Sequence, residues 1–280
     1  MTFDLKQTDP RLFYTIATAS IAPRPIAFAS TIDKNGNVNL SPFSFFNFMG
    51  IDPPILVFSP NKRGRDGSQK HTTENLHEVP EVVINLVDFS MVQQMSLSSC
   101  EFPKGVNEFV KAGFTAEKSQ LIQPPRVKES PVQFECKVLE IKAYGTANLI
   151  ICEVLMAHIN DDLLNQDGKI DQLKTDWVAR LGGDWYARIT PDSLFEVSKP
   201  NQKQGIGIDQ IPDFIKNSDV LTGNELGKLG NIEKLPTREE IKNYFTDNQL
   251  VNSENKILLA QELLLQNQVF EAWCVLLSNQ

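Results

Sequence analysis

The chain has 280 residues, of which 41% are hydrophobic and 22% are charged, with a formal net charge of −8 at pH 7. This is the composition of a soluble globular protein that can bury a core. The acidic balance argues against nucleic acid or an anionic membrane as the main partner, although it leaves room for a local basic pocket.

Strand patterns dominate residues 20–190. We expect strands at 25–31, 38–48, 53–60, 81–89, 132–145 and 147–160. Asn35-Gly36, between the first two, is a strong signal for a two-residue hairpin turn. Many strands joined by short turns favour a closed antiparallel barrel over a parallel α/β sheet. No GxGxxG follows a strand and opens a helix, which argues against a Rossmann fold.

Short helices are expected between the strands, at 70–80, 89–99 and 106–113. Thr72 or Thr73 is the predicted N-cap of the first helix, and Gly113 is the predicted C-cap of the third. These helices would be peripheral to the barrel.

The character of the chain changes near residue 200, where a loop-rich stretch begins. Thr237-x-x-Glu240 has the signature of a capping box, and 252–277 is the longest helix candidate. Apolar residues cover much of the circumference of this candidate, so it must bury against another surface. That surface is either its own barrel, where the helix would narrow access to a ligand, or a second subunit.

Polar side chains recur in the most apolar stretch of the chain, residues 39–60. They are Ser41, Ser44, Asn47 and Ser59. A buried hydroxyl without a hydrogen bond costs roughly 1–3 kcal/mol, so a series of them suggests ligand contacts. Pro42 cannot donate to a ladder and predicts an irregular edge. A flat aromatic ligand with a polar rim would suit this edge, packing on Phe43 or Phe45.

The following loop, residues 60–75, is rich in cations and hydroxyls. It contains Lys62, Arg63, Arg65, Lys70, Thr72 and Thr73. The loop is either a solvated basic surface or, with a helix N-terminus, an anion site whose natural occupant is a phosphate. Together with the strand before it, the second interpretation predicts a ligand with a flat heterocycle at one end and a phosphate at the other.

The segment 20–31 contributes a third set of candidates. Pro23 and Pro25 fix the backbone on both sides of Arg24, so its guanidinium stands on a stiff support; a lone arginine is otherwise surface charge. Ser30 and Thr31 are either strand-end hydroxyls or ligand contacts.

Four stretches then resemble one family in order and spacing. They are APRPIAFASTIDKNGNVNLSPFSFFN, DPPILVFSPN, KHTTENLHEVPEVVINLV and WVARLGGDWYARI. They resemble the RP-(I/V)-A-x-x-S-T, N-x-(S/A)-P-x-S-x-F, K-D-T-x-x-N and R-L-G-G-x-x-Y motifs of the flavin reductase-like FMN-binding split-barrel family. The resemblance spans about residues 10–215. His71 departs from it, because the family often has Asp at this position.

The resemblance implies a mainly β fold. The expected architecture is a six-stranded Greek-key split barrel over residues 1–215, with peripheral helices and a largely helical extension over 216–280. It also implies a homodimer with FMN near the interface. The residues implied at the flavin ring and ribityl chain are Ser30, Thr31, Ser41, Pro42, Phe43 and Ser44, and those at the phosphate are Arg63, Lys70, Thr72 and Thr73. Arg24, the Gly182-Gly183 turn and Tyr186 would lie near the flavin or the dimer contact; Tyr186 could equally belong to the core.

The implied function is an FMN-dependent oxidoreductase that transfers hydride from NADH or NADPH to FMN and on to free flavin or a small acceptor. Such a reaction needs no catalytic acid–base residues from the protein, because the cofactor carries the chemistry. The alternatives are an FMN-binding electron carrier or flavin store without NAD(P)H turnover, and a β-barrel interaction module without a cofactor.

Cellular location and metal content are also predicted. Cysteines and histidines are scattered without metal-ligand spacing, so neither a disulfide framework nor a metal site is expected. The N-terminus has no signal-peptide pattern, and no apolar run approaches the roughly 18 residues of a membrane span. These features predict a cytoplasmic protein without membrane or nucleic-acid partners.

Overall fold

The computed structural model describes residues 1–197, 203–248 and 255–278. The chain divides into two compact units, Met1–Phe195 and Glu196–Gln280. This division lies before the expected one at 215, because Ile206, Ile211 and Ile215 pack into the core of the second unit. Each unit is described by itself.

The first unit is built on one antiparallel sheet of seven strands in the order β2-β1-β5-β8-β9-β4-β3. The strands are β1 Ala27–Ile32, β2 Val38–Phe43, β3 Phe46–Ile51, β4 Pro54–Phe58, β5 Glu81–Asn85, β8 Val132–Tyr144 and β9 Ala147–Ile159. Two further pairs lie outside this sheet: β6 Ala116–Glu117 with β7 Arg126–Val127, and β10 Val178–Arg180 with β11 Tyr186–Arg188. The expected mainly β fold is confirmed.

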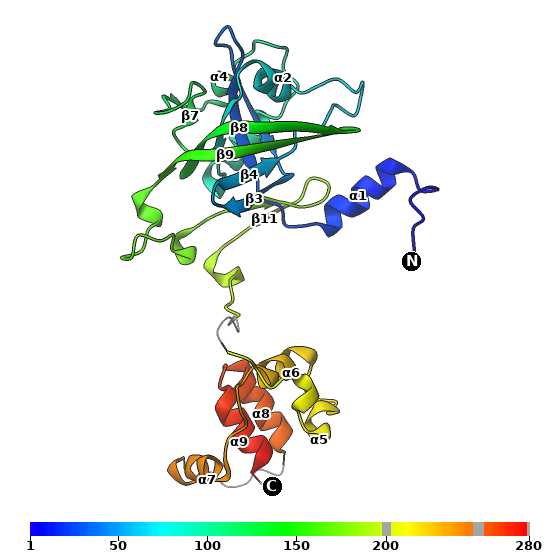
Figure 1. The fold of residues 1–280 in the computed structure, drawn as a ribbon, viewed down its shortest axis with the longest axis vertical. Coiled ribbons are helices and arrows are strands. Elements are labelled where there is room, and N and C mark those ends of the chain that lie inside the picture. The colour runs from blue at the N-terminus through cyan, green and yellow to red at the C-terminus, as the bar shows by residue number, and fades with distance from the viewer. Residues whose placement is uncertain (198–202, 249–254, 279–280) are drawn as a thin grey trace. The chain divides into compact units, whose positions relative to one another are not determined.

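The two edge strands of the sheet, β2 and β3, follow each other in the chain. Only Ser44 and Phe45 separate them, although β2 pairs with β1 and β3 pairs with β4 at the opposite edge. The sheet must therefore curl until its edges approach each other at this bend, as in a split barrel (Figure 1). The prediction of one strand over 38–48 was wrong, and this break explains why the sheet has seven strands instead of the expected six.

Both faces of the central strands are buried, as β1 illustrates. Ala27 and Ala29 point into the cluster inside the curl, which also contains Leu76 of the helix α2. Ile26 and Phe28 point into a second cluster under α3 and α4. All six residues of β1 are buried, including the hydroxyl-bearing Ser30 and Thr31, so the strand is covered on both faces.

Helices of the first unit cover the sheet or extend from it. They are α1 Pro10–Ser20, α2 His71–Glu78, α3 Val92–Leu97 and α4 Glu108–Ala112. The predicted N-cap of α2 was wrong, because Lys70 occupies that position without a side-chain cap bond. Gly113 is confirmed as the C-cap of α4, with φ +73°. The sequence pattern did not predict α1, which begins after an Asp9 N-cap and has no buried residue.

The turn between β1 and β2 is longer than predicted. Asp33 to Asn37 connect the two strands, and the Asp33 carboxylate accepts from the backbone N–H groups of Asn35 and Asn37, at 2.9 Å each. Gly36 adopts φ +82°, the left-handed conformation that the Asn-Gly pair indicated.

The second unit is helical. It contains α5 Asp213–Lys216, α6 Gly223–Gly230, α7 Arg238–Asp247, α8 Lys256–Leu265 and α9 Val269–Leu277. Trp273 is fully buried in its core and donates from Nε1 to the carbonyl of Leu229 at 3.1 Å. The Thr237–Glu240 capping box is confirmed.

The prediction of one long helix over 252–277 was wrong. The chain turns at Asn267, which has φ +59°, and α8 packs against α9. Much of the apolar surface of this segment is therefore buried in the core of the second unit, whereas Leu258, Leu265 and Phe270 stay exposed. Residues 252–254 lie outside the described residues. None of the helices in the described ranges is long and apolar enough to cross a membrane.

Candidate functional site

A polar cavity lies between β2, the loop before α2, the start of α2 and the segment after α3. We call it the cationic cavity; its lining residues are Asn39, Ser41, Arg63, Lys70, His71, Thr72, Ser98, Ser99, Cys100, Glu101, Phe102 and Glu108. The structure thus brings together Ser41, Arg63, Lys70 and Thr72, four of the residues predicted from two separate motifs. The volume of the cavity is about 20 Å³.

A carboxylate lies among the cations of this cavity. Glu101 Oε1 lies 3.4 Å from Arg63 Nε and accepts from Lys70 Nζ at 3.3 Å, and Glu101 Oε2 lies 3.6 Å from Arg65 Nη1. The hydrogen bond and charge of Lys70, with the charges of Arg65 and Arg63, hold the pKa of the Glu101 carboxyl below its ordinary value. Glu101 is therefore ionised at neutral pH.

His71, the residue that departs from the family motif, lies beside the same arginine. Its Nε2 is 3.3 Å from Arg63 Nη2, a donor that requires an acceptor nitrogen on the imidazole. Burial lowers the pKa of His71, and the positive charge of Arg63 lowers it further. His71 is therefore neutral at neutral pH and supports Arg63 as a hydrogen-bond acceptor.

The lining of the cavity also contains a buried carboxyl group. Glu108, at the start of α4, is 4% exposed and its Oε2 accepts from the backbone N–H of Leu40 at 3.0 Å. Burial raises the pKa of Glu108. Next to it, Thr72 Oγ1 accepts from Asn39 Nδ2 at 3.0 Å, which connects α2 to β2.

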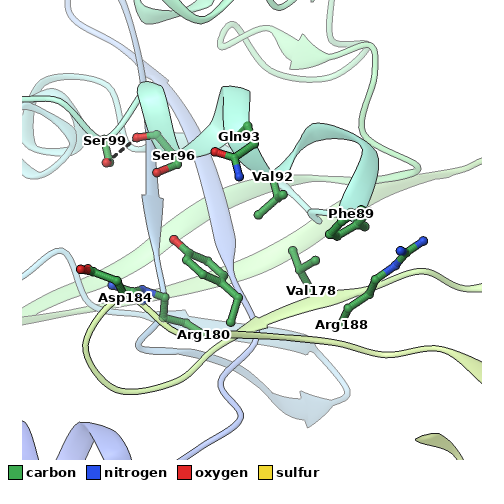
Figure 2. A pocket seen from close by; sticks show the side chains of 10 residues that line it. Phe89, Val92, Gln93, Ser96, Ser99, Val178, Arg180, Asp184 and Arg188 are labelled. Carbon is green, nitrogen blue, oxygen red and sulfur yellow. Dashed lines mark hydrogen bonds between the residues drawn. The ribbon is translucent and has the colours of Figure 1, made fainter. Parts of the chain in front are cut away.

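A second, larger cavity lies between α3 and the β10–β11 hairpin (Figure 2). We call it the aromatic cavity; its volume is about 480 Å³, and it is lined by Phe89, Val92, Gln93, Ser96, Ser99, Val178, Arg180, Asp184, Tyr186 and Arg188. Ser99 lines both cavities, so they adjoin. Tyr186, predicted from the RLGG motif, belongs to this second cavity.

Two arginines stack on the aromatic rings of this cavity. The Arg180 guanidinium lies 4.6 Å from the centroid of the Tyr186 ring, and that of Arg188 lies 3.8 Å from the centroid of Phe89. Arg188 also makes a two-bond ion pair with Asp176, at 2.7 and 2.9 Å. Such stacks hold flat side chains in place, and this cavity is suited to a flat ring.

Arg24 lies at the β2–β3 bend and is used for internal contacts. Its guanidinium donates to the carbonyls of Thr18 and Ile21 and, at 2.8 Å, to that of Leu181; its Nε donates to Ser44 Oγ at 3.4 Å. The side chain thus connects the end of α1, the RLGG turn and the bend, and it is 8% exposed.

Other predicted residues lie in the sheet or on the buried side of α2. Ser30, Thr31 and Thr73 are fully buried; Thr31 Oγ1 accepts from Asn75 Nδ2 at 3.2 Å, whereas Ser30 Oγ and Thr73 Oγ1 have no hydrogen-bond partner in the described part of the chain. Phe43 belongs to the inner core, and Pro42 of β2 pairs with Phe28 of β1. None of these five lines either cavity.

Sequence reasoning missed Glu101, Glu108 and the α3 residues of the aromatic cavity. Glu101 is one glutamate in a polar loop, and Glu108 follows a helix cap, so neither stands out in sequence. The described residues contain no group of three or more His, Cys, Asp or Glu placed to hold a metal ion.

Comparisons with known proteins agree on one family. Residues 19–174 match the family model described as a flavin reductase like domain. A protein of unassigned function from Aquifex aeolicus is 37% identical over 197 residues, which cover 70% of this chain and 100% of the relative.

Solved structures share the fold of the matched region. The nitrilotriacetate monooxygenase component B of Bacillus cereus is 27% identical with a TM-score of 0.65, covering 70% of this chain and 98% of that one. The 2-nitrobenzoate 2-nitroreductase of Pseudomonas fluorescens is 26% identical with a TM-score of 0.65, covering 74% and 100%. An FMN-binding protein from Thermus thermophilus, 14% identical with a TM-score of 0.57 over 71% and 99%, is similar in fold alone.

Proposed function

This chain belongs to the flavin reductase-like domain family, and we propose from that premise that it is an FMN-dependent oxidoreductase. It would take hydride from NADH or NADPH and pass the electrons to free flavin or another small acceptor. The observation that carries the proposal is the junction of two different cavities at Ser99, one cationic and one aromatic. FMN has the same two ends, a phosphate and a flat heterocycle.

The charge of the cationic cavity suits a phosphate, because its cations already bind an anion of the chain. The Glu101 carboxylate lies within 3.6 Å of three cationic side chains, as a phosphate oxygen would. Arg63, Lys70 and the Thr72 hydroxyl, beside the N-terminus of α2, are the donors that we assign to the phosphate. Ser41, on the wall of the same cavity, is assigned to the ribityl chain.

The aromatic cavity fits the flavin ring by size and lining. Its volume of about 480 Å³ contrasts with about 20 Å³ for the cationic cavity. Tyr186 and Phe89 offer apolar surfaces, and Arg180 and Arg188 supply positive charge, which favours an electron-rich ring. Bound FMN would supply the redox chemistry, and the chain would bind it, orient it and exclude water from it.

The remaining predicted residues are assigned supporting positions in this proposal. Arg24, Pro42, Phe43 and Ser44 shape the β2–β3 bend, and Ser30, Thr31 and Thr73 lie behind the wall of the site. The family resemblance implies direct contact of these side chains with FMN, whereas this proposal assigns them none, because the structure uses these side chains internally or buries them.

We also propose a homodimer, on the ground of α1. This helix has no buried residue and exposes Leu12, Phe13 and Tyr14 to solvent. Large apolar side chains left uncovered on a helix favour a partner surface, and a second copy would supply one. Light scattering on the purified protein tests this: a mass of one chain would contradict it.

The test of the function is to load the purified protein with FMN and add NADH or NADPH while following flavin absorbance. Bleaching within seconds, with colour restored by an added acceptor, is the expected result. Bound FMN that stays oxidised with both nucleotides would favour the electron carrier or flavin store. Failure to bind FMN would overturn both functions and favour an interaction module.

A further inference from the structure

The cationic cavity holds a carboxylate of the chain itself. Glu101 connects Arg63 and Lys70 through a single oxygen, at 3.4 and 3.3 Å. The Arg63 side chain is only 12% exposed and also donates to the carbonyl of Gln69, so it is held in place independently of Glu101. The cations therefore form a preset site, and Glu101 is its present anion.

The space left in this cavity is too small for a phosphate group. About 20 Å³ is free, and a cavity needs roughly 10–15 Å³ of such space for one water molecule. A phosphate brings three terminal oxygens, each about the size of a water. To contact Arg63 and Lys70 together within this cavity, it must take the place that the Glu101 carboxylate now occupies.

Glu101 is free to make that movement. Its side chain is 42% exposed, and its hydrogen bonds and ion pairs to Lys70, Arg63 and Arg65 are the contacts of a partly solvated surface group. Exposed ion pairs are weak, so exchanging this carboxylate for a phosphate is energetically easy. The low pKa of Glu101 keeps it charged at neutral pH, so the two anions compete for the same cations.

We propose that Glu101 is an internal competitor of the flavin phosphate and that it thereby limits the preference of the site for FMN over riboflavin. The inference rests on the proposed function, because it takes the cationic cavity as the phosphate site. Riboflavin lacks the phosphate and need not displace Glu101. Glu101 is thus a specificity-determining residue that weakens binding of the phosphorylated flavin.

Glu101→Gln tests this, since it removes the charge and keeps the size of the side chain. Flavin fluorescence titrations of the full-length variant should show FMN binding about tenfold tighter than in the unaltered protein, with riboflavin affinity unchanged. Glu101→Ala, which also frees space, should give at least the same gain. The gain should shrink at high salt, which screens the competing charges.

Glu74→Gln is the matched control. Glu74 makes a comparable partly exposed ion pair with Lys104, at 3.0 Å, but does not line the cationic cavity. This variant should leave the FMN-to-riboflavin preference unchanged.

Three results would overturn the inference. FMN affinity could be unchanged or weaker in both Glu101 variants, which would make Glu101 an organiser of the cations. Riboflavin could gain as much as FMN, which would make the effect independent of the phosphate. The third result is that neither flavin binds to any of the proteins. That result alone would also remove the proposed function.

Discussion

Gly182 lies directly against Ala19: a Cβ atom built on Gly182 would come within 2.8 Å of the Ala19 Cβ. Gly182 belongs to the turn between β10 and β11, and Ala19 to the last turn of α1. The same junction is fixed by Arg24, which donates to the carbonyls of Ile21 and Leu181. The first glycine of the RLGG motif is therefore required by the close approach of α1 to the wall of the aromatic cavity.

Gly182→Ala should destabilise the first unit by about 1–3 kcal/mol, the usual cost of overpacking, because the helix backbone also lies within 3.0 Å of the new atom. Urea denaturation followed by the fluorescence of Trp177 and Trp185 measures this. Gly64→Ala is the control, since nothing lies within 4 Å of a Cβ at Gly64. Equal stability of the two variants would contradict the assigned role of the contact.

Lys70→Met should weaken FMN binding about tenfold and leave riboflavin binding unaffected. The expected loss is that of one charge-assisted contact to the phosphate, about 1.5 kcal/mol. Lys62→Met is the control, because Lys62 lies in the same loop but does not line the cationic cavity. A parallel loss for riboflavin would indicate that Lys70 supports the ring or the fold.

Local chemistry explains what the sequence could predict. The positive φ of Gly36, the Gly113 cap and the Thr237–Glu240 capping box depend on a few adjacent residues, and all three are present, although the turn that contains Gly36 is longer than predicted. The family resemblance also implied a phosphate site at Arg63, Lys70 and Thr72, and these three residues line one cavity together with Ser41.

The elements whose bounds were predicted wrongly are those that tertiary packing determines. Residues 38–48 form two strands because β2 and β3 pair with different neighbours, β1 and β4. Residues 256–277 form two helices because Asn267 reverses the chain and lets α8 pack on α9. Hydrophobic periodicity does not show such reversals when both halves are apolar.

Part of the candidate site could not be predicted, because it also depends on contacts between distant segments of the chain. Glu101 and Glu108 reach the cations and β2 from a different segment, residues 98–108, which no motif connected with the cationic loop or with β2. Contact between distant segments of the chain is decided by the tertiary fold, and neither charge pattern nor motif spacing encodes it here.

Ser30→Ala should raise the stability of the first unit by about 1 kcal/mol. The Ser30 hydroxyl is fully buried and has no hydrogen-bond partner in the described part of the chain. On folding it loses its hydrogen bonds to water without forming another, and alanine avoids this cost. Thermal unfolding measures the change. FMN affinity should be unchanged, because Ser30 lines neither cavity. A loss of FMN affinity would instead show that the hydroxyl reaches the flavin.

Glu108→Gln should make the stability of the first unit less dependent on pH. Burial raises the pKa of Glu108 in the folded chain above its value of about 4.5 in the unfolded chain, so the folded state binds this proton more tightly. The resulting stabilisation is present below the unfolded pKa and is lost as pH rises through the folded pKa. The glutamine cannot ionise, and its amide oxygen can still accept from the N–H of Leu40.

The variant should therefore be more stable than the unaltered protein at pH 8, with a difference that shrinks steadily toward about pH 4. Urea denaturation at a series of pH values measures both curves. Glu140→Gln, an exposed position on β8, is the control and should show no such trend. If the Glu108→Gln difference were constant across this range, the carboxyl would already be ionised throughout, and its burial would have no effect on the pH dependence of stability.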